Sequence, residues 1–240
     1  MRLDLARRVA YYRLCRATTS RSVDPPLEQL PRPSILACWH SSVALLFLYS
    51  PDPSLHCFVS DLPEAHTQAE LLGHLGFAVV PRPNMQGSVR AARRLLQGGS
   101  RLLVAVDGPH GPSREVKRGA MYLASAVQCP IVPVVARSTP ELLLPGWDRP
   151  GAPILYSRVA ATFGKAIEPP ADRLGRNVKL RELQDELDRL DLSASSPDCP
   201  VGRRAVASIS TPALALAGIR PARVGWERVG HSPWARCPRR

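Results

Sequence analysis

The chain has 240 residues, 45% of them hydrophobic, which is enough to bury one sizeable core. It carries 32 lysines and arginines against 20 acidic residues, a formal net charge of +12, which favours an anionic partner such as a membrane surface, a phosphorylated cofactor or nucleic acid. The six cysteines form no C-x-x-C pair and have no metal-ligand spacing, so we expect buried, reduced thiols and no bound metal. No N-terminal stretch combines a long apolar core with a small-residue cleavage site, so we expect a cytoplasmic protein.

Short apolar runs alternate with helical patterns from residue 34 onward, which predicts one α/β domain with a mixed, mainly parallel sheet flanked by helices. The predicted strands are 35–39, 54–59, 77–80, 101–106, 130–135 and 154–163, and the predicted helices are 41–49, 64–75, 86–97, 119–127 and 178–190. In helix 86–97 we expect Val89, Ala92 and Leu96 to face inward. Pro133 lies inside a predicted strand and implies an edge position or a bulge. Residues 138–153 contain four prolines and are predicted to form a long irregular connection.

Two segments flank this domain, which we place at residues 34–192. Within the basic segment 1–33, arginines alternate with Leu, Val and Tyr at helical intervals, so it either lies on a membrane surface or covers the domain as an ordinary helix. The tail, residues 193–240, holds eight arginines against two acidic residues, about half of the net charge. It is rich in Pro, Ser and Ala, so we expect disorder or a loosely docked extension.

The most informative stretch is the sequence Asp107-Gly108-Pro109-His110-Gly111-Pro112, which follows a predicted strand. Two glycines and two prolines in five residues neither continue a strand nor start a helix, so the backbone must turn tightly and expose amide groups. Arg114, Lys117 and Arg118 follow the turn. This combination favours binding of a phosphate or a carboxylate, and the alternative is a plain connection from strand to helix.

His40 is the candidate general base. It directly follows the predicted strand 35–39, and the unperturbed pKa of a histidine side chain lies near neutrality. The alternative is a structural histidine in the core. Arg82, held between Pro81 and Pro83 after another strand, is a second candidate for anion binding, or else a solvated loop arginine.

These segments resemble the four sequence blocks of the lysophospholipid acyltransferase-like superfamily, the glycerolphosphate acyltransferase type. The matching residues are Trp39-His40 in the first block, Val79–Arg82 in the second, Val106–Pro112 with the later Gly119 in the third, and Pro130–Val134 in the fourth. The resemblance covers residues 34–190, and the third and fourth blocks together are its specific part. The chain is most similar to a bacterial branch of unknown function whose third block reads Asp-Gly-Pro-Arg-Gly-Pro.

The resemblance implies a glycerolphosphate acyltransferase-like fold and a role in phospholipid biosynthesis. A fatty acyl group would move from acyl-CoA or acyl carrier protein, as substrate, to a lysophospholipid-like acceptor on the inner face of the cell membrane. His40 would deprotonate the acceptor hydroxyl, Arg82 would help hold a phosphate, and Pro133 would match the fourth-block proline. The residues that would contact the acceptor at the third block are Asp107, Gly108, Pro109, Gly111, Arg114 and Lys117.

The chain departs from the family pattern at three places. Leu45 stands where most of the superfamily has the aspartate that orients the histidine ring, and Asp61 and Asp107 are candidate substitutes. The sequence Arg82-Pro83-Asn84 stands where the similar branch has Arg-Gly-Ser, and His110 replaces the arginine of Asp-Gly-Pro-Arg. The alternative function is therefore a catalytically inactive lipid-binding relative of the same fold.

Two further function classes have weaker support. Nucleic-acid binding is suggested by the net charge and the arginine-rich tail, but aromatic residues make up only 5% of the chain, and it has no zinc spacing and no recognisable helix-turn-helix. A serine hydrolase is disfavoured because the Gly-x-Ser-x-Gly sequence of the nucleophile turn is absent.

Overall fold

A seven-stranded mixed sheet forms the centre of the computed structural model, which describes residues 2–60, 62–80, 85–170 and 172–194. The strand order is β1-β7-β6-β2-β5-β3-β4, and all neighbours are parallel except β6 and β7. The strands are β1 (Ser20–Asp24), β2 (Ser34–Cys38), β3 (Leu55–Phe58), β4 (Ala78–Val79), β5 (Arg101–Ala105), β6 (Ile131–Thr139) and β7 (Arg158–Phe163). The predicted class, α/β with a mixed and mainly parallel sheet, is confirmed.

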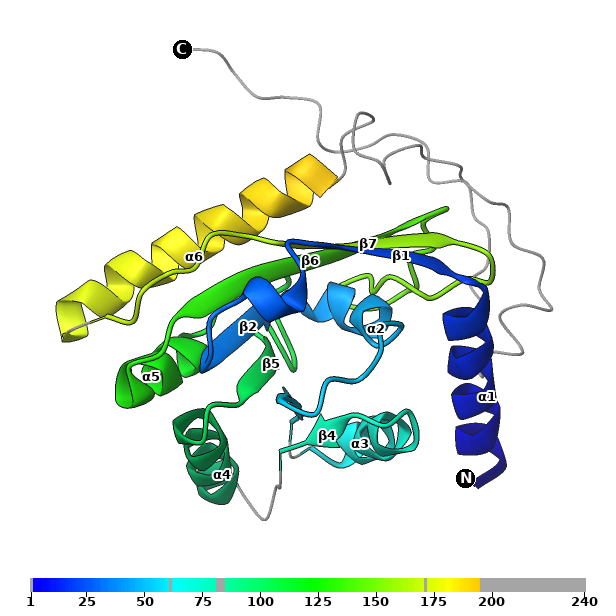
Figure 1. Cartoon of the computed structure of the whole chain (residues 1–240), viewed down its shortest axis with the longest axis horizontal. Helices are drawn as coiled ribbons and strands as arrows, with labels where there is room; N and C mark the ends of the chain where they lie inside the picture. Colours follow the sequence, from blue (N-terminus) through cyan, green and yellow to red (C-terminus); the bar gives the residue numbers. More distant parts are fainter. Residues whose placement is uncertain (1, 61, 81–84, 171, 195–240) are drawn as a thin grey trace, which may run out of the picture.

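Helices cover both faces of this sheet, and in Figure 1 α6 and α3 lie on opposite sides of it. One face is covered by α4 (Met85–Gln97), α5 (Arg118–Val127) and α6 (Arg173–Ala194). The other face is covered by α1 (Arg2–Thr18), α2 (Val43–Leu46) and α3 (Pro63–His74). Because β2 is buried on both faces, with Ile35 against one helical layer and Leu36 against the other, its sequence is a continuous apolar run.

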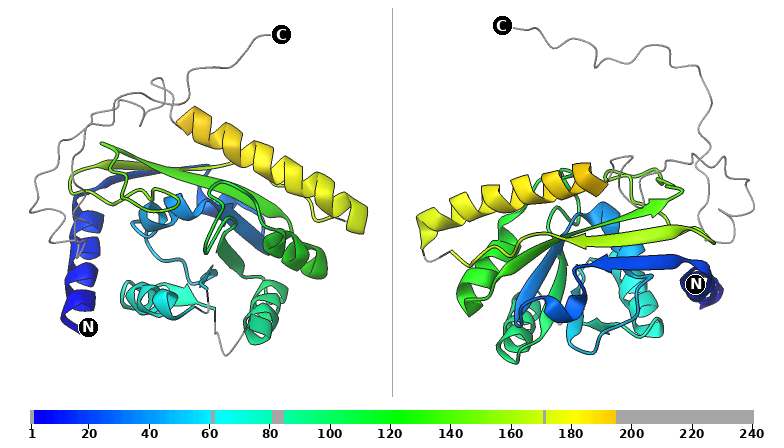
Figure 2. Two further views of the ribbon diagram at one scale, coloured as in Figure 1. Left: turned by 180° about the vertical axis from the view of Figure 1, so that it is seen from behind. Right: turned by 45° about the horizontal axis from the view of Figure 1, so that its top comes forward.

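The first strand, β1, was not predicted from the sequence. It has a single apolar residue, Val23, and four of its five residues are exposed. It nevertheless pairs in parallel with β7 at the edge of the sheet (Figure 2). Residue 34 is therefore not a structural boundary, because residues 20–24 belong to the same sheet as the domain that follows.

Pro133 does not lie on an edge strand, because β6 is flanked by β2 on one side and β7 on the other. It is the last residue of β6 that pairs with β2, and Val134, the next residue, is the first that pairs with β7. The missing backbone N–H therefore falls where β6 passes from one partner to the other, which explains why a proline is accepted inside the sheet.

Two predicted helices differ in detail. The helix expected at 41–49 is a 3-10 turn, His40–Ser42, followed by the short helix α2. In α4, Ala92 and Leu96 are buried as predicted, but Val89 is 46% exposed. The inward prediction for Val89 is wrong because the neighbouring Ser88, 3% exposed, takes the buried position in line with Ala92 and Leu96.

Helix α1 covers the domain with its apolar face. Val9 and Cys15 are buried against the sheet and its helices. Arg13 also donates a hydrogen bond to the His74 carbonyl at the end of α3, 3.1 Å away. The sequence left two interpretations of this segment, a membrane-surface helix and a helix that covers the domain, and the buried apolar face agrees with the second. Among the described residues, no helix combines the length and the apolar composition needed to cross a bilayer. The predicted tail lies, after residue 194, outside the described residues.

Candidate active site

The parallel pairing of β2 and β5 brings two predicted site residues together. Cys38, at the end of β2, is in register with Ala105, at the end of β5, and the Val106 N–H donates a hydrogen bond to the Cys38 carbonyl at 2.9 Å. The residues that follow the two strands, His40 and Asp107, therefore leave the sheet side by side at its carboxyl edge. This edge is where α/β sheets commonly bind ligands.

Asp107 is fully buried and fixes the backbone of this edge. Its Oδ1 accepts a hydrogen bond from the His40 backbone N–H at 2.7 Å, and its Oδ2 accepts one from the Arg114 backbone N–H at 3.0 Å. Both carboxylate oxygens are thus used within the protein. Asp107 holds the backbone of His40 and the turn, so it is neither the orienter of the ring nor positioned as a direct substrate ligand.

The His40 ring is oriented by Asp148, a residue that the sequence analysis did not identify. His40 Nδ1 lies 2.6 Å from Asp148 Oδ2. The Asp148 side chain is only 3% exposed, whereas that of His40 is 32% exposed. A carboxylate only accepts hydrogen bonds, so this contact assigns a proton to Nδ1 and leaves Nε2 as the basic nitrogen of the neutral ring. The pair has the arrangement of a general base with its orienting carboxylate.

The loop between β6 and β7 carries Asp148 back to His40. An antiparallel bridge between Leu143 and Gly151 closes the loop on itself, and the Gly151 N–H donates to the Ser41 carbonyl at 2.9 Å. Leu45 packs directly against Gly151, where an added Cβ would lie 3.0 Å from Leu45 Cδ1. Leu45 therefore supports the loop that carries Asp148.

Trp147 covers one side of the imidazole. Its ring centroid lies 5.3 Å from that of His40, with the planes tilted by 34°. The indole also contacts the turn after β5, because a Cβ added to Gly111 would lie 2.8 Å from Trp147 Cε3. Gly111 has φ +71°, a left-handed conformation that glycine adopts without strain. Turn and loop thus meet at Gly111 and Trp147, beside the exposed part of His40.

Two of the cations predicted to bind the acceptor, Lys117 and Arg114, have partners within the protein. Lys117 Nζ donates to the Gly108 carbonyl at 2.9 Å, which ties the start of α5 to the turn. Arg114 Nη2 lies 2.5 Å from Asp191 Oδ2 of α6, and Asp191 also pairs with Arg137. These contacts stabilise the turn, so neither side chain is an unengaged phosphate ligand in this structure.

Of the remaining predicted residues, those of the turn after β5 are described by the structure and two others are not. Gly108 adjoins the imidazole, since a Cβ at that position would lie 3.4 Å from His40 Cδ2. Pro109 and His110 are exposed at the tip of the turn. Arg82 and Asp61 lie outside the described residues, so their predicted roles stay predictions.

Comparison with known proteins gives two similarities. No family model matches the chain. An uncharacterized protein of Rickettsia prowazekii (strain Madrid E) is 24% identical over 152 residues, covering 62% of this chain and 70% of that protein. The crystal structure of the 1-acyl-sn-glycerophosphate (LPA) acyltransferase, PlsC, from Thermotoga maritima is similar with a TM-score of 0.46 and 16% identity, covering 78% of this chain and 79% of that chain. Neither similarity assigns a role to a residue of this protein.

Proposed function

We propose that this protein is an acyltransferase that moves a fatty acyl group from acyl-CoA or acyl carrier protein to the hydroxyl of a lysophospholipid-like acceptor. The observation that carries the proposal is the contact between His40 Nδ1 and Asp148 Oδ2, 2.6 Å, with the histidine partly exposed and the aspartate buried. The sequence resemblance to the acyltransferase blocks supplies the reaction class, and the site supplies a base that suits it.

Each proton and bond of the proposed transfer can be followed. His40 Nε2 takes the proton of the acceptor hydroxyl while the oxygen attacks the thioester carbonyl carbon. As the tetrahedral intermediate collapses, the C–S bond breaks and the protonated Nε2 returns its proton to the leaving sulfur. Asp148 stabilises the transient imidazolium and keeps Nε2 directed away from the carboxylate. The products are an ester and a free thiol.

The turn after β5 suits an acceptor that approaches the backbone. Gly108 has no side chain to block the approach and lies next to the His40 ring, whereas the space over Gly111 is filled by the Trp147 ring. Arg82 is the proposed phosphate ligand. A peripheral position on the inner face of the cell membrane, with phospholipid or lysophospholipid as partner and acyl carrier protein as a possible donor, fits the net charge of +12.

A catalytically inactive lipid-binding relative is the second candidate. The observation that favours it is that two cations expected at an acceptor site already have partners: Arg114 pairs with Asp191, and Lys117 donates to the Gly108 carbonyl. This candidate predicts binding of a lysophospholipid without product, and binding that does not depend on His40.

Product formation distinguishes the two candidates. Purified protein would be given labelled acyl-CoA or acyl carrier protein with a panel of lysophospholipids, alongside His40→Ala and the matched control His66→Ala, which removes an exposed imidazole of α3. We expect product from the wild type, a loss of about 10²-fold to 10⁴-fold in kcat for His40→Ala, and no change for His66→Ala. Retained lipid binding with no product from any donor would support the inactive relative instead.

A further inference from the structure

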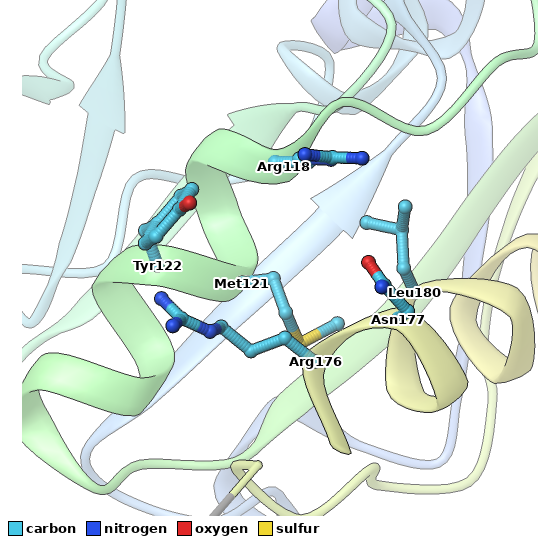
Figure 3. Close-up of a pocket in the computed structure, with 6 residues that line it drawn as sticks. All are labelled: Arg118, Met121, Tyr122, Arg176, Asn177 and Leu180. Carbon is cyan, nitrogen blue, oxygen red and sulfur yellow. The ribbon is translucent and has the colours of Figure 1, made fainter. Parts of the chain in front are cut away.

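A cavity of about 270 Å³ lies between α5 and α6, apart from the His40 site (Figure 3). Three lining residues come from the first turns of α5 and three from the first turns of α6, and none of the six is acidic. The residues are Arg118, Met121, Tyr122, Arg176, Asn177 and Leu180. The proposed acyl transfer uses none of them.

The polar part of the cavity is cationic, and one of its two arginines is held by an aromatic ring. Arg118 and Arg176 both line it, and neither forms an ion pair within the described part of the chain. The Arg176 guanidinium carbon lies 4.6 Å from the centre of the Tyr122 ring, a cation–π contact that restricts its orientation. Arg118, Arg176 and Asn177 therefore place hydrogen-bond donors around the cavity, with the Arg176 guanidinium beside the Tyr122 ring (Figure 3).

The apolar part of the cavity gives it a second kind of surface. Met121 is buried in the core cluster beneath α5 and α6, and the partly buried Leu180 packs against that cluster. A ligand whose anion reaches the arginines would thus contact thioether and alkyl groups with its remaining atoms. The volume is slightly below the range of sites for drug-sized molecules, so it suits a small head group rather than a long acyl chain.

We propose that this cavity binds a small phosphomonoester, with the phosphate between Arg118 and Arg176 and the adjoining carbons on Met121 and Leu180. A phosphate monoester presents three terminal oxygens and up to two negative charges, which two guanidinium groups and an amide satisfy better than they satisfy a carboxylate. The inference is independent of acyl transfer, because its test reads binding and not turnover.

Isothermal titration calorimetry of the full chain with hexyl phosphate and with inorganic phosphate tests the proposal. We expect saturable binding of both, tighter for hexyl phosphate because of its apolar contacts. We expect Arg118→Gln and Arg176→Gln each to weaken binding about tenfold or more, since each removes a charge-assisted hydrogen bond. Arg181→Gln is the matched control, because Arg181 is exposed on α6 and does not line the cavity. Its affinity should equal that of the wild type.

Binding to phosphatidylcholine vesicles with and without phosphatidic acid identifies the source of the phosphomonoester. Loss of phosphatidic-acid binding in Arg118→Gln and Arg176→Gln would support a lipid head group as the ligand, whereas loss of hexyl phosphate binding alone would support a soluble one. The proposal is overturned if the wild type binds none of these probes, or if Arg181→Gln weakens binding as much as the two cavity variants. Circular dichroism of each variant shows whether the fold is kept.

Discussion

Asp148 Oδ2 lies 2.6 Å from Nδ1 of His40, although 108 positions separate the two residues in the chain. His40 follows the end of β2, and Asp148 lies in the loop after β6, the strand next to β2 in the sheet. The carboxylate thus reaches the imidazole through tertiary structure, where most of the resembling superfamily has it on the same short segment. In the proposed reaction, His40 and Asp148 therefore form the pair of base and orienting carboxylate although Leu45 stands where most of the resembling superfamily has aspartate.

Asp148→Asn should lower kcat far more than it changes KM. The amide cannot stabilise the imidazolium as a carboxylate does, and it can hold the ring in the wrong tautomer, so we expect a loss of about 10²-fold to 10⁴-fold in kcat. The Asp148 side chain is only 3% exposed, so KM should stay within a few-fold of its original value. Steady-state kinetics with varied acceptor measures both. A raised KM with unchanged kcat would show that Asp148 binds substrate instead.

Gly111→Ala should loosen the contact between turn and loop. Its φ of +71° disfavours alanine, and the new Cβ would lie 2.8 Å from Trp147 Cε3. We expect a loss of about 1–3 kcal/mol in the free energy of unfolding and a displaced Trp147. Urea unfolding and the tryptophan fluorescence of the native state report the two effects. Gly119→Ala is the control, because an added Cβ there meets nothing within 4 Å.

Leu45→Asp introduces the residue that most of the resembling superfamily has at this position, but it should not supply a second orienting carboxylate. Leu45 is 1% exposed and packs on Gly151, so the new carboxylate would be buried without a cation and the loop would lose its support. We expect a loss of about 3 kcal/mol or more in stability, with lower activity. Thermal unfolding measures the first effect. A variant as stable and as active as the wild type would contradict the packing role assigned to Leu45.

Arg101→Met should destabilise the fold away from the site. The Arg101 side chain is fully buried beneath residues 27–31, and its Nη2 donates to the carbonyls of Leu27 at 2.8 Å and Leu30 at 2.7 Å. Methionine removes both hydrogen bonds and leaves the Leu27 carbonyl with only the Leu30 backbone N–H as donor, so we expect a loss of about 2–4 kcal/mol. Arg93→Met, an exposed change on α4, should stay within about 0.5 kcal/mol of the wild type in the same urea titration.

The buried cysteines should be unreactive while the protein is folded. Burial raises the pKa of Cys15 and of Cys129 to about 11 and that of Cys57 to about 12, and it raises the pKa of Cys38 as well. At about pH 8 the thiolate fraction of each is then about a thousandth or less.

The variant Cys199→Ser/Cys237→Ser isolates these four thiols for a colorimetric thiol assay. We expect no rapid reaction in buffer and reaction of all four thiols in urea. Rapid reaction in buffer would show that a thiol is accessible in the folded protein.

The sequence predicts the layers of this fold well because its central strands are buried on both faces. The apolar runs of β2, β5 and β6 stand out for that reason, and parallel pairing then places His40 beside the turn that begins at Asp107. Strand β1 lacks such a signal, because one apolar residue on an exposed edge strand does not distinguish it from a loop.

The partner of His40 could not be predicted in the same way. Asp148 lies in a proline-rich connection that has no helical or strand periodicity. Long-range contacts fold this connection back, among them the bridge between Leu143 and Gly151 and the bond from the Gly151 N–H to the Ser41 carbonyl just after β2. The one signal was composition, since Trp147 and Asp148 are flanked by glycine and arginine in a segment too long for a simple turn. The partners of Arg114 and Lys117 could not be predicted from the sequence either. Arg114 pairs with Asp191, which is distant in the chain, and Lys117 donates to a backbone carbonyl.

A double-mutant cycle on His40 and Asp148 tests the central claim most directly. Single-turnover acyl transfer would be measured for the wild type, His40→Ala, Asp148→Asn and the double variant. When two residues act as one unit, removing the second causes no further loss of rate once the first is gone. We therefore expect product from the wild type, and the same rate for the double variant as for His40→Ala. Turnover of His40→Ala at the wild-type rate would contradict the account, as would a full additional loss in the double variant.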